Sequence, residues 1–79
     1  MSRTNEVADC VKRAIDRYFR DLDGEQPSAI YDMVISTVEI AMIETVLQRT
    51  EGNQTLAATM LGINRNTLRK KIGLLNITL

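Results

Sequence analysis

The sequence predicts an all-α protein with a four-helix subunit. Apolar residues recur at intervals of three and four through most of the chain, which is the spacing of one helical face. No stretch alternates apolar and polar residues as a half-buried strand would, and the single proline, Pro27, lies in the loop-like segment DGEQPS. We expect helices over 6–22, from Ser28 to about Arg49, over 53–61 and over 65–72.

The first helix, residues 6–22, is amphipathic and is followed by an acidic connection. Its apolar face comprises Val7, Val11, Ala14, Ile15, Tyr18, Phe19 and Leu22. Acidic residues near the connection (Asp21, Asp23 and Glu25) raise the alternative of a cation site. The spacing of a calcium-binding loop is missing, so we interpret this segment as a solvated loop.

The second helix is apolar around almost its whole circumference. Ser28 is its predicted N-cap, and Gly52 is predicted to stop it. Such a helix must be buried on several sides, and a 79-residue subunit has too little mass to bury it. We therefore expect an intertwined homodimer through the two N-terminal helices; the alternative is the central helix of a monomeric bundle. The expected dimer interface comprises Ile30, Val34, Val38, Ala41 and Met42.

Composition excludes several classes of protein. The chain has one cysteine, Cys10, and no histidine, so it can form neither an internal disulfide nor a Cys/His zinc site. Without histidine, a phosphate-cradling loop or clustered carboxylates, no reaction can be assembled, so we expect no enzyme, no cofactor and no small-molecule substrate. Charged residues interrupt every apolar run and the N-terminus lacks a signal peptide. We expect a cytoplasmic protein without a membrane partner.

Net charge is zero, but the charges are unevenly distributed. Residues 1–49 carry six basic and nine acidic side chains, a net −3, whereas residues 50–79 carry four basic and one acidic, a net +3. Such asymmetry indicates that one face meets a polyanion, although chance clustering on a solvated surface gives the same count.

The C-terminal stretch GNQTLAATMLGINRNTLRKK has the pattern of a helix-turn-helix. Asn53 or Thr55 is expected to cap its first helix, and Asn64 its second. Ala57 or Ala58 would allow the helices to approach closely, Gly62 would supply the positive φ of the turn, and Ile63 would fill the corner between them. We expect a single domain over 1–79, with dimerisation helices over 6–50 and the helix-turn-helix over 53–73.

The last helix presents its basic residues away from its apolar stripe. Leu68 and Ile72 define that stripe, while Asn66, Thr67 and Lys70 fall opposite it. Arg65, Arg69 and Lys71 lie on the flanks, so we expect all four basic side chains to project outward. An ordinary amphipathic helix would show the same phase. In helix-turn-helix proteins, residues at the start of this helix reach base edges and flanking residues hold phosphates.

The same C-terminal stretch resembles the signature of the Fis family of bacterial nucleoid-associated proteins, and bacterial enhancer-binding activators share a looser version. VKRAIDRYFRDLDGE and YDMVISTVE resemble the family too, so the similarity covers nearly the whole chain. The Met1 start and the length favour a free-standing protein over an activator fragment. The resemblance implies a homodimer that binds and bends double-stranded DNA and regulates transcription in the nucleoid, with RNA polymerase as a candidate partner. Recognition helices in such dimers lie closer together than one turn of DNA, about 34 Å, so the DNA must bend.

The resemblance also implies site residues at matching positions. Asn64, Arg65 and Lys70 match positions near the bases in the major groove. The positions that hold the DNA backbone are matched by Asn53, Gln54, Thr55, Thr67, Arg69 and Lys71.

Several departures from the family bear on DNA affinity. Leu56 and Glu51 stand where basic residues are usual, and the tail GLLNITL lacks lysines, so we expect weaker binding and a shallower salt dependence. Ala41 replaces a proline that kinks the central helix, which predicts a straighter helix. The chain begins almost at its first helix, so the arm that contacts DNA invertases is missing; we expect no stimulation of inversion, which robust stimulation of an invertase would contradict.

Two hypotheses therefore remain open. The first is a DNA-bending dimer with loose sequence preference. The second is a dimeric protein-interaction module with weakened DNA affinity, favoured by Leu56, Glu51 and the apolar tail. A DNA-binding domain like those of enhancer-binding activators is a variant of the first. Binding across a salt series separates the two hypotheses.

Overall fold

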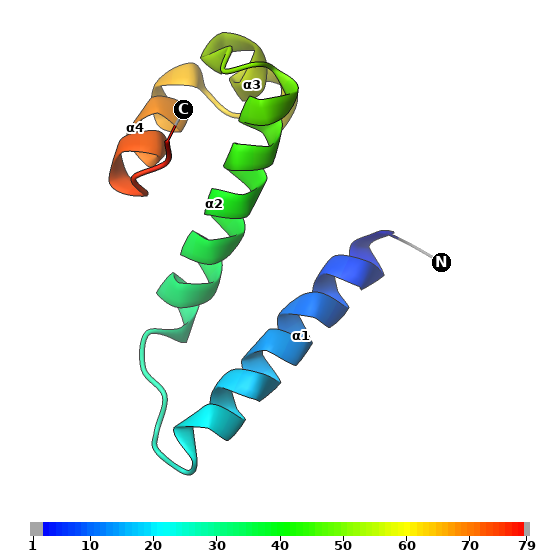
Figure 1. Ribbon diagram of the computed structural model, residues 1–79, viewed down its shortest axis with the longest axis vertical. Helices are drawn as coiled ribbons and strands as arrows, with labels where there is room; N and C mark the ends of the chain where they lie inside the picture. Colours follow the sequence, from blue (N-terminus) through cyan, green and yellow to red (C-terminus); the bar gives the residue numbers. More distant parts are fainter. Residues whose placement is uncertain (1–2, 79) are drawn as a thin grey trace. The chain divides into compact units, whose positions relative to one another are not determined.

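The computed structural model describes residues 3–78, with side chains from Glu6 onward. It contains α1 (Arg3–Leu22), α2 (Ile30–Arg49), α3 (Gln54–Leu61) and α4 (Arg65–Leu74), in that order (Figure 1). The described residues include no strand, which confirms the all-α prediction. The chain divides into two compact units, residues 1–34 and 35–79, so the boundary lies within α2.

In the N-terminal unit, α1 has the amphipathic character expected from its sequence. Its half-buried residues, Val11, Ile15, Tyr18 and Leu22, recur every three or four positions along one face. Glu6 in the first turn and Arg20 in the last turn complement the helix dipole. The chain leaves α1 through Asp23 and Gly24, both at positive φ.

The predicted N-cap of α2 is wrong. The helix begins at Ile30, and the carbonyl of Ala29, not of Ser28, accepts the first helical hydrogen bond, from the Met33 N–H at 3.1 Å. Ala29 has a φ of 57°, which turns the chain into the helix and leaves Ser28 one residue outside the capping position. Sequence reasoning favoured serine for its side chain, but backbone geometry decided the boundary.

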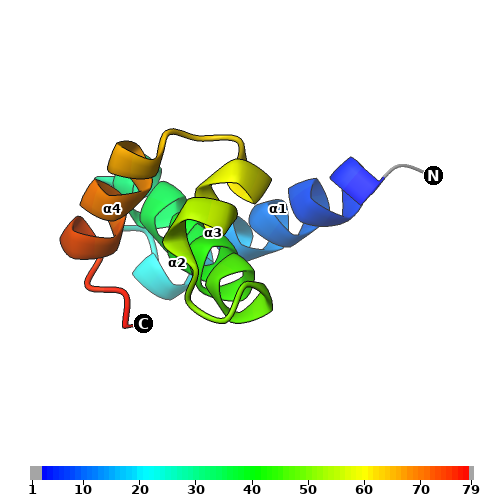
Figure 2. The same ribbon diagram turned by 90° about the horizontal axis from the view of Figure 1, so that it is seen from above.

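The C-terminal unit is a three-helix arrangement in which the end of α2 supports α3 and α4 (Figure 2). Its core contains residues from all three helices and from the segment after α4: Ile43, Leu47, Ala57, Ala58, Leu68 and Ile77. Ala57 and Ala58 are almost fully buried, so their small side chains allow the neighbouring helices to approach α3 closely, as predicted. Ile63 packs against this core, which confirms its predicted place in the corner.

Each helix of this unit is followed within two residues by a left-handed residue and by a backbone hydrogen bond that reaches back five residues. Gly62 has a φ of 77°, and the Ile63 N–H donates to the Ala58 carbonyl at 3.1 Å, which confirms the predicted glycine turn. The α2 end has the same geometry at Glu51, where φ is 54°, with the Gly52 N–H bonded to the Leu47 carbonyl at 2.9 Å.

The segment after α4 folds back through the same type of turn. Asn76 has a φ of 55°, and the Ile77 N–H donates to the Ile72 carbonyl at 3.0 Å. This turn buries Ile77 in the core and packs Leu75 against it, whereas Leu74 stays exposed. Leu79 lies outside the described residues.

Candidate nucleic-acid interface

The outer face of α4 combines cations with short polar side chains. Leu68 is completely buried, and at 100° per residue the residues on the opposite side of the helix face outward. The exposed set comprises Arg65, Asn66, Thr67, Arg69 and Lys70. Of the residues assigned from sequence to DNA contact, Arg65, Thr67, Arg69 and Lys70 therefore lie together on one accessible helix.

Asn64 caps α4, as predicted. Its Oδ1 accepts a hydrogen bond from the Asn66 N–H at 2.7 Å, and its own carbonyl accepts from the Leu68 N–H at 3.0 Å. The capping bond uses Oδ1 of this exposed side chain, so the Nδ2 amide group is its remaining hydrogen-bond donor. Asn64 can therefore offer a hydrogen bond to an acceptor at the helix N-terminus, where the partial positive charge favours an anion or an electronegative base edge.

Lys71 differs from the other basic residues of α4. Its Nζ lies 2.6 Å from Oε2 of Glu39 on α2, and both side chains are partly buried. The prediction that all four basic side chains project freely outward is wrong for this residue. Lys71 lies three positions after Leu68 and next to Ile72, so it borders the buried stripe and faces α2.

The start of α3 presents a second polar group. Asn53 is the N-cap, since its Oδ1 accepts from the Leu56 N–H at 3.0 Å; Thr55, the alternative cap, lies inside the helix. Gln54 is half-buried and Thr55 is exposed. The N–H groups of Gln54 and Thr55, which precede the capped Leu56 N–H, have no partner within the helix and can donate to a phosphate.

The rest of α3 is uncharged. Its eight residues include no acidic or basic side chain, and Leu56 and Met60 are exposed. Glu51, just before α3, is exposed as well. Of the two helices, only α4 therefore supplies positive charge near the turn. This agrees with the expectation from Leu56 and Glu51, which stand where the family usually has basic residues.

The residues assigned to a dimer interface are only partly covered within the chain. Ile30 and Val34 are half-buried, whereas Val38, Ala41 and Met42 are exposed. The helix runs through Ala41 without a break, and the Ala41 carbonyl accepts a bond from the Thr45 hydroxyl at 2.7 Å. No second copy is present, so the interface stays a prediction.

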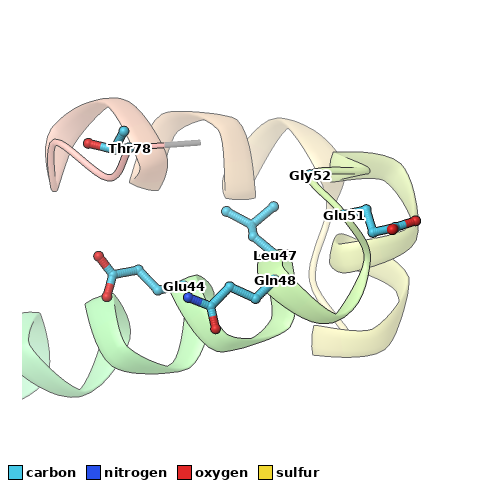
Figure 3. Close-up of a pocket in the computed structure, with 6 residues that line it drawn as sticks. All are labelled: Glu44, Leu47, Gln48, Glu51, Gly52 and Thr78. Atoms are coloured by element: carbon cyan, nitrogen blue, oxygen red, sulfur yellow. The ribbon is translucent and has the colours of Figure 1, made fainter.

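A hollow of about 410 Å³ lies beside the end of α2, lined by Glu44, Leu47, Gln48, Glu51, Gly52 and Thr78 (Figure 3). Leu47 is directed from α2 toward the segment that carries Thr78, while the Glu51 side chain points away from it. The two carboxylates of the hollow do not converge on one point, so the lining has no pair placed for acid–base chemistry.

Other features of residues 3–78 bear on membranes, metal ions and thiol chemistry. Across residues 3–78, no helix is long and apolar enough to cross a membrane. Within the same range, no three histidine, cysteine or acidic side chains gather where they could bind a metal ion, so the acidic connection after α1 is not such a group. Cys10 is a free, exposed thiol.

Sequence reasoning missed Glu39. Glu39 and Lys71 are 32 residues apart, and nothing in either local pattern marks them as partners. Asn66 was recognised as outward-facing but not as part of the candidate site, although it shares the outermost face with Lys70. A helical wheel is sufficient to find Asn66, whereas the Glu39 contact requires the packing of α4 on α2.

Comparison with known proteins identifies relatives of this chain. Residues 34–73 match the family described as "Bacterial regulatory protein, Fis family". The chain is 54% identical over 72 residues to a "Putative Fis-like DNA-binding protein" of Ralstonia nicotianae (strain ATCC BAA-1114 / GMI1000), covering 91% of this chain and 92% of that protein. It is 56% identical over 62 residues to "DNA-binding protein Fis" of Glaesserella parasuis serovar 5 (strain SH0165), covering 78% of this chain and 63% of that protein. The chain belongs to the Fis family of bacterial regulatory proteins.

Proposed function

We propose that this protein is a DNA-binding, DNA-bending homodimer that regulates transcription in the bacterial nucleoid. The observation that carries the proposal is the exposed face of α4, where Arg65, Arg69 and Lys70 stand on a helix anchored by the buried Leu68. An exposed basic helix that follows a glycine turn fits the major groove of double-stranded DNA. The printed names of both relatives include DNA binding, which supports the same function.

Asn64, Arg65 and Lys70 are the proposed base-proximal residues. Arg65 is the first residue of α4, and Lys70 lies on the outermost face of the helix. Arginine can donate two hydrogen bonds to guanine, which makes it the strongest source of sequence preference in this set. The cap on Asn64 leaves Nδ2 as a donor, so we expect this residue to recognise an acceptor rather than to form a bidentate pair with adenine.

The proposed phosphate contacts lie on both sides of these residues. Asn53, Gln54 and Thr55 gather at the N-terminus of α3, where backbone N–H groups add to the side-chain donors. Thr67 and Arg69 are exposed on α4. Lys71 completes the set only when it is released from Glu39.

The homodimer is proposed from the apolar surface of α2. Ile30, Val34, Val38, Ala41 and Met42 form its expected interface, and three of the five are exposed in the single chain. An apolar surface of this kind on a small protein is typical of an interface. Two copies of α4 brought together by this helix would engage successive major grooves on one side of the duplex, which bends the DNA.

Fluorescence anisotropy with a labelled duplex, repeated over a range of salt concentrations, tests DNA binding. We expect affinity to fall steeply with salt, by a slope of about 0.9 for each phosphate neutralised. Bending is tested by energy transfer between dyes at the two ends of the duplex, which should rise when protein is added. Salt-insensitive or absent binding would contradict the proposal.

The second candidate function is a dimeric protein-interaction module with weak DNA affinity. The exposed Leu56 and Met60 on an uncharged α3 favour it, because a DNA-facing surface usually carries phosphate-binding residues there. RNA polymerase is the proposed protein partner in either case. Weak, salt-insensitive binding to DNA together with saturable binding to polymerase would favour this second function.

A further inference from the structure

Among the described residues, one ion pair joins α4 to α2. The Lys71 Nζ and Glu39 Oε2 atoms are 2.6 Å apart, and the side chains are 35% and 24% exposed. Arg65, Arg69 and Lys70 differ, since they are exposed and form no ion pair with any side chain from Glu6 to Thr78. One of the four cations of the helix is therefore neutralised before any DNA is bound.

A carboxylate and a phosphate compete for the same ammonium group. Lys71 borders the DNA-facing surface and Glu39 holds its charge, so DNA binding releases no counterion there unless the pair opens. If the pair opens, Glu39 is left as an unpaired negative charge near the duplex. Both outcomes lower affinity relative to a chain with a neutral residue at position 39.

We propose that Glu39 is an intramolecular competitor for DNA phosphate that sets the strength and salt dependence of DNA binding through Lys71. The proposal rests on the DNA-binding function proposed above and adds a residue that tunes it. It also accounts for a binding surface less basic than the sequence of α4 indicates.

The alternative role for Glu39 is to hold α4 in position, and the structure favours competition instead. The position of α4 is already fixed by the buried Leu68, by Ile72 and Leu75 packed on the core, and by the tail turn that buries Ile77. The pair is accessible to water at both side chains, and ion pairs of this kind contribute little to stability. Loss of Glu39 should therefore free Lys71 without displacing the helix.

The test compares wild-type protein with Glu39→Gln, Lys71→Met and the double variant, using anisotropy with one labelled duplex over a salt series. Glu39→Gln should raise affinity by up to roughly tenfold per subunit at 0.1 M salt and steepen the salt slope by up to about 0.9 per subunit. Lys71→Met alone should leave the slope near that of wild type. The steepening should disappear when both substitutions are combined.

Glu44→Gln is the matched control, because it removes the same charge from an exposed position on α2. It should change affinity only through long-range repulsion and leave the slope unchanged. Weaker binding by Glu39→Gln, an unchanged slope, or a gain that persists with Lys71→Met would overturn the proposal. If no variant binds DNA at any salt concentration, the proposed function fails instead.

Two further measurements keep the test valid if Glu39→Gln does not fold. Glu39→Asp retains the charge but shortens the side chain, so it should weaken the pair and give a smaller increase in slope. Reductive methylation of wild-type lysines, followed by mass spectrometry, should modify Lys70 faster than Lys71 in the free protein. Equal rates for the two lysines would contradict the pairing in solution.

Discussion

The two halves of α2 are similarly apolar in sequence but differ in how the chain covers them. Toward the C-terminal end, Ile43 is 2% exposed because it packs with α3, α4 and Ile77 in one core. In the N-terminal half, Ile35 and Val38 are each 39% exposed. One helix therefore carries two apolar surfaces, and the chain itself covers only the one toward the C-terminal end.

This division assigns different tasks to the two halves. The C-terminal half is part of the helix-turn-helix unit, so it holds α4 in place for the proposed DNA contact. The N-terminal half carries Ile30, Val34 and Val38, three of the five residues proposed to contact a second subunit. Substitutions in the two halves should therefore separate loss of folding from loss of assembly.

The largest expected effect comes from Leu47→Ala in the C-terminal half. Leu47 is buried in the core, so truncation should lower the free energy of unfolding by about 2–5 kcal/mol through lost burial and a cavity. Urea denaturation followed by circular dichroism measures this. An exposed control, Gln48→Ala, should change the free energy little; equal effects of the two would contradict the described core.

Val38→Asp should instead disrupt the dimer. A charge placed in an apolar interface costs several kcal/mol, so about 3 kcal/mol corresponds to a roughly 100-fold weaker dimer. Sedimentation velocity over a concentration series checks this. Gln48→Asp adds the same charge to the other half of α2 and should leave the mass dimeric. If Val38→Asp also sediments as a dimer, the N-terminal half is not the interface.

Arg65→Ala should affect neither folding nor assembly. If Arg65 pairs with guanine, its loss should cost about 1–3 kcal/mol of binding and flatten the preference among DNA sequences. Arg69→Ala should weaken all sequences alike and reduce the salt slope by about 0.9 per subunit. Anisotropy titrations with several duplexes separate the two, and identical behaviour would show that base and phosphate roles are wrongly assigned.

The smallest expected effect is a gain in stability from Glu51→Gly, at the junction of α2 with the helix-turn-helix. Glu51 has a φ of 54°, a conformation that glycine adopts without the steric cost a side chain incurs. The substitution should raise the free energy of unfolding by about 1 kcal/mol, measured by urea denaturation. Gln48→Gly, inside the helix, should be destabilising; a loss of stability in both variants would refute the left-handed cap.

Much of the fold followed from local patterns. The periodicity of 6–22 and the capping residues Asn53 and Asn64 act over a few residues, so they can be read without knowing what packs where. Gly62 is similar, because a tight turn between two short helices requires a positive φ. The prediction that Ser28 caps α2 was wrong. The helix begins after Ala29 because the positive φ of that residue turns the backbone there, whatever the capping preference of the serine side chain.

The sequence by itself determined the helices, the turn, and the phase that places Arg65, Thr67, Arg69 and Lys70 on an exposed face. These features depend on contacts between residues close in the chain. Only the tertiary structure decided that Ile77 returns to the core, that residues 35–49 of α2 belong to the helix-turn-helix unit, and that Glu39 neutralises Lys71. Each of those depends on which surfaces meet across more than one helix, and helical periodicity carries no information about that choice.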